Sequence, residues 1–350
     1  MAKIDALLKL MIEHNASDLH ITSGSSPLLR IDGELEKIAY HELSEDEVKL
    51  LVFEILAEPE IEQLEAKFDL DFAYEIEGAA RFRANIYSKH GGVGAAFRLI
   101  PRDIKTFSDL GLPPAVRALS RLRKGLVIVT GPTGSGKSTT LAAMVDLLNK
   151  ERKAHVITLE DPLEFIHENQ TCLIMQRQVG IHVESFASGL RAALREDPNV
   201  IMVGEMRDLE TIALAITAAE VGLLVFGTLH TSSAAKTVDR IIDAFPKDQQ
   251  DQIRTMLGES LKGVIAQQLL KKVDGKGRVA VLEILVGSQA VGNLIREGKT
   301  FQIPSAMQTG KKLGMQTIDQ HLEVLVEEGK ISKQEAFLYA VEKAKFAPDD

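Results

Sequence analysis

The chain has 350 residues and a formal net charge of -9, with 45% hydrophobic and 26% charged residues. This length suits two domains and the composition is that of a globular protein, while the negative charge disfavours nucleic acid as the main partner, because phosphate binding needs a basic surface. No apolar run approaches the ~20 residues that span a bilayer, and no continuous apolar segment follows Lys3, so we expect a cytoplasmic protein without a signal peptide. The single cysteine, Cys172, cannot form an internal disulfide, and we interpret it as a small apolar residue.

The first 105 residues are predicted to form an α+β domain. An apolar stripe at helical spacing predicts a first helix that ends near Asn15. Ser44 and Glu47 form a capping-box pattern, which predicts a second helix reaching about Ala57.

Strands of this domain are predicted from turn residues and alternation. Asp32-Gly33 predicts a tight turn between strands 28–31 and 35–38. Alternation over 68–74 predicts a half-buried strand, and the next two strands, around Gly91-Gly92, form a hairpin. The polar face of this hairpin would carry Arg81, Arg83 and Arg98. These are either solvated side chains or arginine fingers that act on a neighbouring subunit, and the residues alone leave both interpretations open.

After a linker that starts at Pro101, strands and helices alternate, which predicts a parallel sheet covered on both faces. The predicted strands are 126–130, 154–159, 200–203 and 223–229, and the predicted helices are 137–149, 186–196 and 208–221. A long helix is expected over 250–270, followed by a hairpin around Asp274-Gly275 and by short helices over 289–345.

A P-loop pattern is complete at Gly131, Pro132, Thr133, Gly134, Ser135, Gly136, Lys137 and Ser138. A buried strand runs into the loop and a helix begins at Lys137, which is the context that this motif requires. The glycines let backbone N–H groups point toward phosphate, and the helix N-terminus adds partial positive charge. We expect Lys137 to reach the β- and γ-phosphates of ATP, Ser138 to ligate Mg²⁺, and Thr139 to support the α-phosphate side.

Acidic and imidazole groups end three other predicted strands. Glu205 follows strand 200–203, and P-loop enzymes hold the Mg²⁺ shell with an acidic residue at the end of a strand beside the P-loop. The usual residue is Asp, so the longer Glu205 suggests contact through a metal-bound water; a helix-capping role is the alternative. Two interpretations of His230 remain open: a sensor of the γ-phosphate and a structural hydrogen-bond partner. Hydrolysis also needs a carboxylate that orients water, and the candidates are Glu160, Asp161 and Glu164.

Together these segments resemble the secretion ATPases of the type II and type IV pilus family. The resemblance runs from Ser17-Asp-Leu-His20 to the helices after Met315. Four boxes match in order: a Walker A loop at 131–139, an aspartate box at 160–164, an atypical Walker B at 203–208 and a histidine box ending at His230. Within the family the chain is most similar to the retraction motors, on residues 194–198, 227–237, 293–297 and 308–310.

The resemblance implies a RecA-like P-loop domain at 106–288, a smaller PAS-like α+β domain at 1–105 and a C-terminal helical region at 289–350. It implies ATP hydrolysis with Glu164 activating water and Glu205 in the Mg²⁺ shell. It also implies a homo-hexamer in which Arg83 and Arg98 reach the next subunit's nucleotide. The expected partners are an inner-membrane pilus platform protein and a paralogous retraction ATPase, and the expected place is the cytoplasmic face of the inner membrane.

Two departures from the family pattern leave room for an accessory or paralogous motor: Leu223 stands where the family commonly has His, and Val291-Gly292 where the retraction motif reads Ile-Arg. A pilus assembly or type II secretion ATPase is a second alternative, although such proteins usually carry an extra domain and a four-cysteine zinc module. A DNA-translocating motor is disfavoured by the net charge, and a subunit without turnover by intact Lys137, Glu164 and Glu205.

Overall fold

The computed structural model describes residues 2–31, 33–100, 103–275 and 277–347. The chain forms two compact units, Met1–Asp103 and Ile104–Asp350, each with its own sheet. Asp32 of the predicted turn and Pro101 of the predicted linker lie outside the described residues. The boundaries predicted near residues 105 and 288 stay predictions. None of the helices among the described residues is long and apolar enough to cross a membrane.

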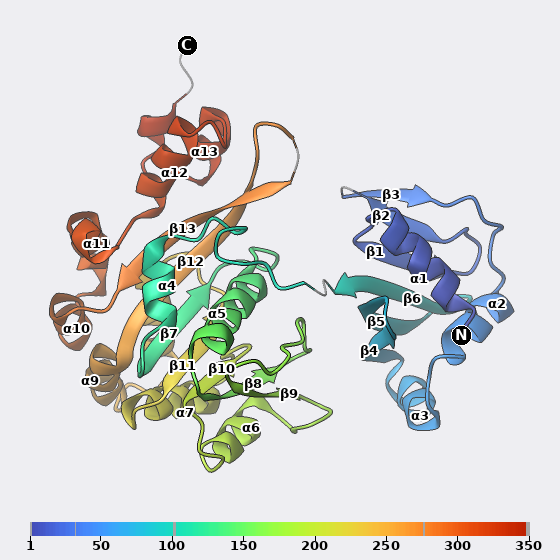
Figure 1. Ribbon diagram of the computed structural model, residues 1–350, viewed down its shortest axis with the longest axis horizontal. Coiled ribbons are helices and arrows are strands. Elements are labelled where there is room, and N and C mark those ends of the chain that lie inside the picture. The colour runs from blue at the N-terminus through green and yellow to red at the C-terminus, as the bar shows by residue number, and fades with distance from the viewer. Residues whose placement is uncertain (1, 32, 101–102, 276, 348–350) are drawn as a thin grey trace. The chain divides into compact units, whose positions relative to one another are not determined.

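The first unit is built on a six-stranded antiparallel sheet with the order β3-β2-β1-β6-β5-β4 (Figure 1). Leu8 of α1 and Val48 of α2 share one buried core with Phe82 of β5 and Phe97 of β6, so both helices cover the same face of the sheet. The strands are β1 Asp18–Thr22, β2 Leu28–Ile31, β3 Glu34–Lys37, β4 Asp69–Ile76, β5 Ala80–Lys89 and β6 Gly92–Ile100. The helices are α1 Ile4–Glu13, α2 Glu45–Phe53 and α3 Glu58–Lys67.

The local signals of this unit are confirmed, with one correction. The capping box is present, because the Ser44 N–H lies 2.8 Å from Glu47 Oε2 and the Glu47 N–H lies 3.3 Å from Ser44 Oγ. The helix it opens ends at Phe53 rather than near residue 57, and a separate helix, α3, follows. Pro59 lies in the first turn of α3, where a helix tolerates a residue without a backbone N–H, so it marks the start of this second helix.

The second unit is an α/β fold around a seven-stranded sheet with the order β13-β12-β7-β11-β10-β8-β9. All strand pairs are parallel except β12 with β13. The strands are β7 Gly125–Thr130, β8 His155–Glu160, β9 Leu173–Gln178, β10 Val200–Val203, β11 Leu224–Leu229, β12 Leu261–Lys271 and β13 Arg278–Val286. The helices that pack on this sheet are α4 Pro114–Ser120, α5 Lys137–Glu151, α6 Phe186–Ala193, α7 Leu209–Glu220, α8 Ala234–Asp243 and α9 Gln250–Ser260.

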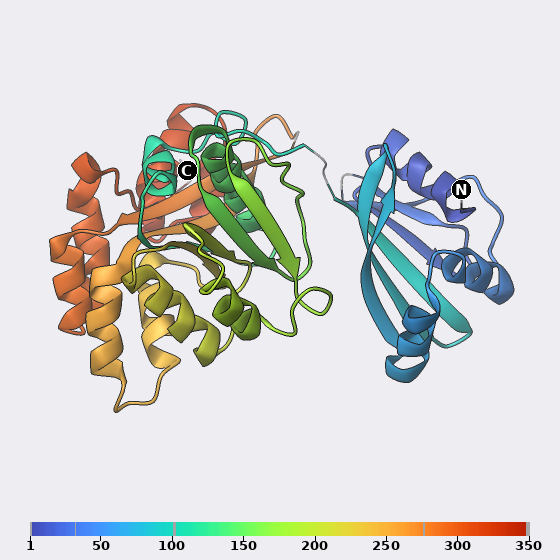
Figure 2. The same cartoon turned by 60° about the horizontal axis from the view of Figure 1, so that its bottom comes forward.

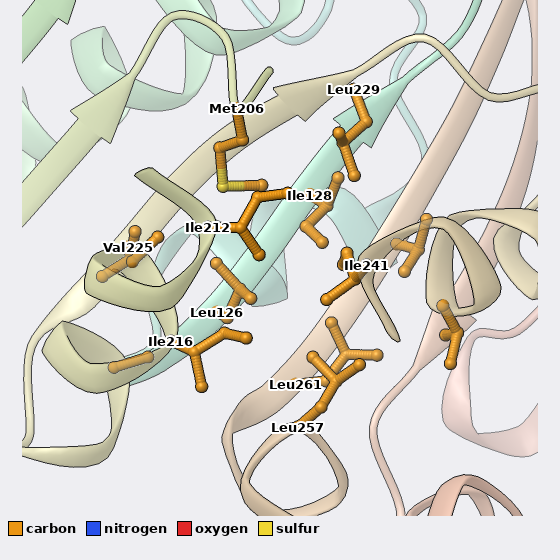
Figure 3. Close-up of a cluster of buried hydrophobic side chains, with 14 of the residues drawn as sticks. Leu126, Ile128, Met206, Ile212, Ile216, Val225, Leu229, Ile241, Leu257 and Leu261 are labelled. Atoms are coloured by element: carbon orange, nitrogen blue, oxygen red, sulfur yellow. The ribbon is translucent and has the colours of Figure 1, made fainter. Parts of the chain in front are cut away.

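Helices lie on both faces of this sheet (Figure 2), which confirms the prediction from the alternating pattern. On one face, Leu126 and Ile128 of β7 pack with Ile212 of α7 and Leu257 of α9 (Figure 3). On the other face, Val127 of the same strand belongs to the core made with α4 and α5. A continuous apolar strand is thus buried from two sides, as parallel sheets require.

The predicted long helix over 250–270 is wrong in its second half. Helix α9 ends at Ser260, and β12 begins at Leu261 and fills the sheet position between β7 and β13. A short apolar run buried on both faces has no two-residue alternation, so periodicity alone does not separate it from a buried helix. The hairpin predicted around Asp274-Gly275 is confirmed, with β12 as its longer first strand.

Short helices follow β13, as predicted. They are α10 Gln289–Arg296, η1 Thr300–Gln302, α11 Ile303–Thr309, η2 Gly310–Leu313, α12 Ile318–Glu327, α13 Lys333–Tyr339 and η3 Lys343–Phe346. Leu322 and Leu325 of α12 bury against Leu270 and Val281 of the β12–β13 hairpin, so this hairpin holds the last helices on the sheet.

Candidate active site

The P-loop joins the end of β7 at Thr130 to the start of α5 at Lys137. Gly131 has φ 144° and Gly136 has φ 87°, both in the range that favours glycine. A Cβ at position 131 would lie 2.2 Å from the Gln267 carbonyl oxygen, so the neighbouring strand also requires glycine there. The loop therefore leads directly into a helix N-terminus, where unpaired backbone N–H groups favour an anion.

Lys137 folds back over this loop. Its Nζ donates to the carbonyl oxygens of Gly131 at 2.9 Å and Pro132 at 3.1 Å. Burial lowers the pKa of Lys137, and the charges of Glu205 and Glu164 oppose that shift. The charges of both carboxylates thus act on the Lys137 ammonium group.

Ser138 and Thr139 lie in the first turn of α5 and are half-buried. The Ser138 hydroxyl and the Glu205 carboxylate are hard oxygen donors, the kind that Mg²⁺ takes together with phosphate oxygens and water. These donors fit the predicted ion. Within the described ranges, no group of three His, Cys, Asp or Glu side chains could hold a metal by itself.

Glu205 follows β10 and is held by two basic side chains. Its Oε1 lies 2.7 Å from Arg207 Nε and 3.1 Å from His230 Nε2. Partial burial would by itself raise the pKa of the Glu205 carboxyl, but the hydrogen bonds and charges of Arg207 and His230 hold it below its usual value. The strand that carries Glu205 was expected to lie beside the strand that leads into the P-loop. This needs correction, because β11 lies between β10 and β7.

His230 comes directly after β11, the immediate neighbour of β7. The two strand ends are joined by Thr130, whose Oγ1 lies 3.0 Å from the Leu229 carbonyl oxygen and 2.9 Å from the Thr231 carbonyl oxygen. The histidine segment is therefore fixed to the end of β7, where the P-loop begins.

The three candidate carboxyl groups after β8 lie in different surroundings. Glu160 is 8% exposed, accepts from Thr158 Oγ1 at 2.6 Å and from Gln176 Nε2 at 3.1 Å, and burial raises its pKa. Asp161 is exposed and its charge acts on Arg207. Glu164 is exposed, and of these three carboxyl groups it is the one whose charge acts on Lys137 of the P-loop.

The predicted arginines belong to the first unit. The predicted hairpin is confirmed, and Arg83 of β5 pairs directly with Arg98 of β6. Arg98 Nε lies 2.8 Å from Asp18 Oδ1 and Arg83 Nε lies 3.6 Å from Asp71 Oδ1, while the Arg98 side chain is 68% exposed and the Arg83 side chain is 43% exposed. Within their own unit, therefore, the arginines are held by carboxylates, and the P-loop residues lie in the other unit.

Three residues that support the site were not predicted. Arg207 neutralises Glu205, Thr130 joins two strand ends, and Gln267 of β12 contacts the P-loop from the adjacent strand. For Gln267 the available signal was a polar pair, Gln267-Gln268, that interrupts an apolar run. The mistaken helix over 250–270 hid its meaning, because only the strand places this side chain beside the P-loop.

Comparison with known proteins agrees with this architecture. The Type II/IV secretion system protein family matches residues 1–337. The chain is 50% identical over 333 residues to the type IV pilus retraction ATPase PilT of Pseudomonas aeruginosa, covering 95% of this chain and 96% of that protein. It is 48% identical over 326 residues to the twitching motility protein of Neisseria gonorrhoeae, covering 91% and 87% of the two chains.

A solved structure of the pilus retraction motor PilT with bound ADP has a TM-score of 0.92 and 44% sequence identity, and the match covers 99% of this chain and 98% of that one. The predicted fold class is confirmed: an N-terminal domain precedes a RecA-like ATPase domain.

Proposed function

This chain belongs to the Type II/IV secretion system protein family, and we propose that it is an ATP-hydrolysing motor that powers type IV pilus retraction. The observation that carries the proposal is the P-loop, with Lys137 lying within the charge influence of Glu164 and Glu205. The similarity to a retraction ATPase over 95% of the chain supports the pilus assignment.

In this proposal the P-loop amides hold the phosphates of ATP and Lys137 offsets the charge that develops on the transferred phosphoryl group. Glu164 orients the attacking water, and its exposure leaves it free to do so, whereas the Glu160 carboxyl is already engaged. Ser138 and Glu205 would hold Mg²⁺, which would neutralise phosphate charge when bound. His230 reports the state of the γ-phosphate through Glu205.

The proposed working form is a homo-hexamer with Arg83 and Arg98 completing the neighbour's site. Head-to-tail contacts in a ring repeat one interface at each boundary. Opening and closing of that interface around nucleotide converts hydrolysis into rigid-body motion. The force passes to an inner-membrane pilus platform protein, so the motor works at the cytoplasmic face of that membrane, alongside a paralogous retraction ATPase.

Steady-state phosphate release tests the enzymatic part. We expect Lys137→Ala to lower turnover by about 100-fold or more, because the lost ammonium stabilised the transition state by several kcal/mol. Lys153→Ala is the matched control, since this exposed lysine lies beyond the end of α5. Equal phosphate release by the wild type and Lys137→Ala would overturn the assignment.

A further inference from the structure

Gln267 lies on β12, directly beside the P-loop. The register of β12 against β7 pairs Ala266 with Thr130, so Gln267 is the next residue along and meets Gly131. The carboxamide is 3% exposed, in a position that the chemistry proposed above does not use.

Both ends of this carboxamide are engaged. Nε2 donates to the Ser135 carbonyl oxygen at 2.7 Å, and Oε1 accepts from Thr140 Oγ1 at 2.7 Å. A backbone carbonyl only accepts, so the nitrogen must face Ser135, and this settles the orientation of the amide. Gln267 therefore bridges the P-loop and the first turn of α5.

The bond to Ser135 fixes the direction of a backbone N–H. In a trans peptide, the carbonyl of one residue and the N–H of the next point in opposite directions. With the Ser135 carbonyl held toward β12, the Gly136 N–H is directed to the other side of the loop, where an anion bound at the helix N-terminus would lie. Gly136 is also required by this contact, because a Cβ there would lie 2.8 Å from Gln267 Nε2.

We infer that Gln267 is a positioning residue that holds the Ser135–Gly136 peptide in the orientation that binds the phosphates of ADP and ATP. The inference rests on the proposed nucleotide-binding function and assigns part of that affinity to a strand outside the Walker and histidine boxes. Loss of the bridge frees the peptide to rotate, which turns one phosphate-binding donor away.

The test is titration of the full-length protein with ADP and Mg²⁺. We expect Gln267→Met, which keeps the length but removes both hydrogen bonds, to raise the Kd for ADP about tenfold. Gln268→Met is the matched control: successive strand side chains point to opposite faces, so this change should leave the Kd within about twofold.

A second variant separates positioning from stability. Gln267→Glu places an acceptor against the Ser135 carbonyl when ionised, but its neutral acid has an O–H that can donate as the amide did. Its ADP affinity, relative to wild type at the same pH, should therefore recover as the pH falls from about 8 to about 5.5. Gln267→Met has no such proton and should show no recovery.

The outcomes are distinct. If folded Gln267→Met binds ADP like the wild type, or if Gln267→Glu follows the wild-type pH profile, the inference is wrong. Should Gln267→Met fail to fold, the pH profile of Gln267→Glu decides alone. If the wild type itself binds no ADP, the proposed function fails first, and the inference fails with it.

Discussion

The acidic segment after β8 shows how surroundings separate chemically similar groups. Glu160 and Glu164 are four residues apart, yet Glu160 is buried among hydrogen bonds and Glu164 is exposed, with its charge acting on Lys137. A carboxylate that orients water needs free lone pairs and access to solvent. Of the two, Glu164 has these properties, and its charge acts on the P-loop lysine.

We therefore expect Glu164→Gln to retain nucleotide binding and to lower hydrolysis by at least ~100-fold, because an amide fills the same volume without acting as a base. Glu160→Gln is the comparison, and it should keep substantial turnover. Phosphate release and ADP titration on both variants provide the measurement. A dead Glu160→Gln beside an active Glu164→Gln would show that the roles are reversed.

The residues of this site were easier to predict from the sequence than the contacts that those residues make. The P-loop was predictable because its glycines, lysine and flanking elements are all local. Gln267 was not, because its partners, Ser135 and Thr140, are brought to it by strand order. Glu205 likewise meets His230 because β10 and β11 are adjacent. The choice among three carboxyl groups likewise depends on burial, which spacing does not encode.

At the scale of elements, α9 and α10 pack unusually closely. A Cβ at Gly292 of α10 would lie 2.6 Å from the Gly258 carbonyl oxygen of α9, and a Cβ at Gly258 would lie 2.9 Å from the Gly292 carbonyl oxygen. Val291 beside it is buried. The departure at Val291-Gly292 from the retraction motif thus coincides with a backbone-to-backbone helix contact that has no room for a side chain at position 292.

Gly292→Ala should consequently destabilise the protein by about 1–3 kcal/mol, although alanine is the better helix former, because the helices must separate. Gln289→Ala, at an exposed position of the same helix, should stay within about 0.5 kcal/mol. Denaturant unfolding monitored by circular dichroism measures both. A Gly292→Ala protein as stable as the wild type would show that α9 and α10 can move apart without a loss of stability.

Helices and strands with a local sequence signal were predicted well. Elements whose conformation depends on pairing with a distant strand were not. Strands β7, β8, β10 and β11 were found as apolar runs between helices. Strand β12 was mistaken for helix because its apolar run follows helix α9 without a break. Its extended conformation is determined by pairing with β7, which is distant in the sequence.

In the proposed hexamer, Arg83 and Arg98 of one subunit complete the nucleotide site of the next subunit. Arg83 and Arg98 pair across β5 and β6, each beside an aspartate, and both keep part of the guanidinium group exposed to solvent, where a phosphate could compete for it. A Lys137→Ala subunit would still supply arginines, and a subunit with Arg83→Ala and Arg98→Ala would still bind ATP in its own P-loop.

Mixing these two inactive proteins should hence restore part of the ATPase activity. Mixing Lys137→Ala with Glu164→Gln is the control: both defects lie in the same unit, so no subunit supplies an intact site and activity should stay at background. Background activity at all ratios of the first mixture, with mixed oligomers demonstrated, would exclude these arginines as trans groups.

The retraction assignment itself is tested most directly in cells that lack the gene and are complemented with either the wild type or Lys137→Ala. Twitching motility and the number of surface pili are recorded together. We expect the deletion strain to lose motility while keeping normal or excess pili, and we expect only the wild-type gene to restore movement. Loss of pili in the deletion strain, which is the phenotype of an assembly motor, would contradict it, as would restored motility with Lys137→Ala.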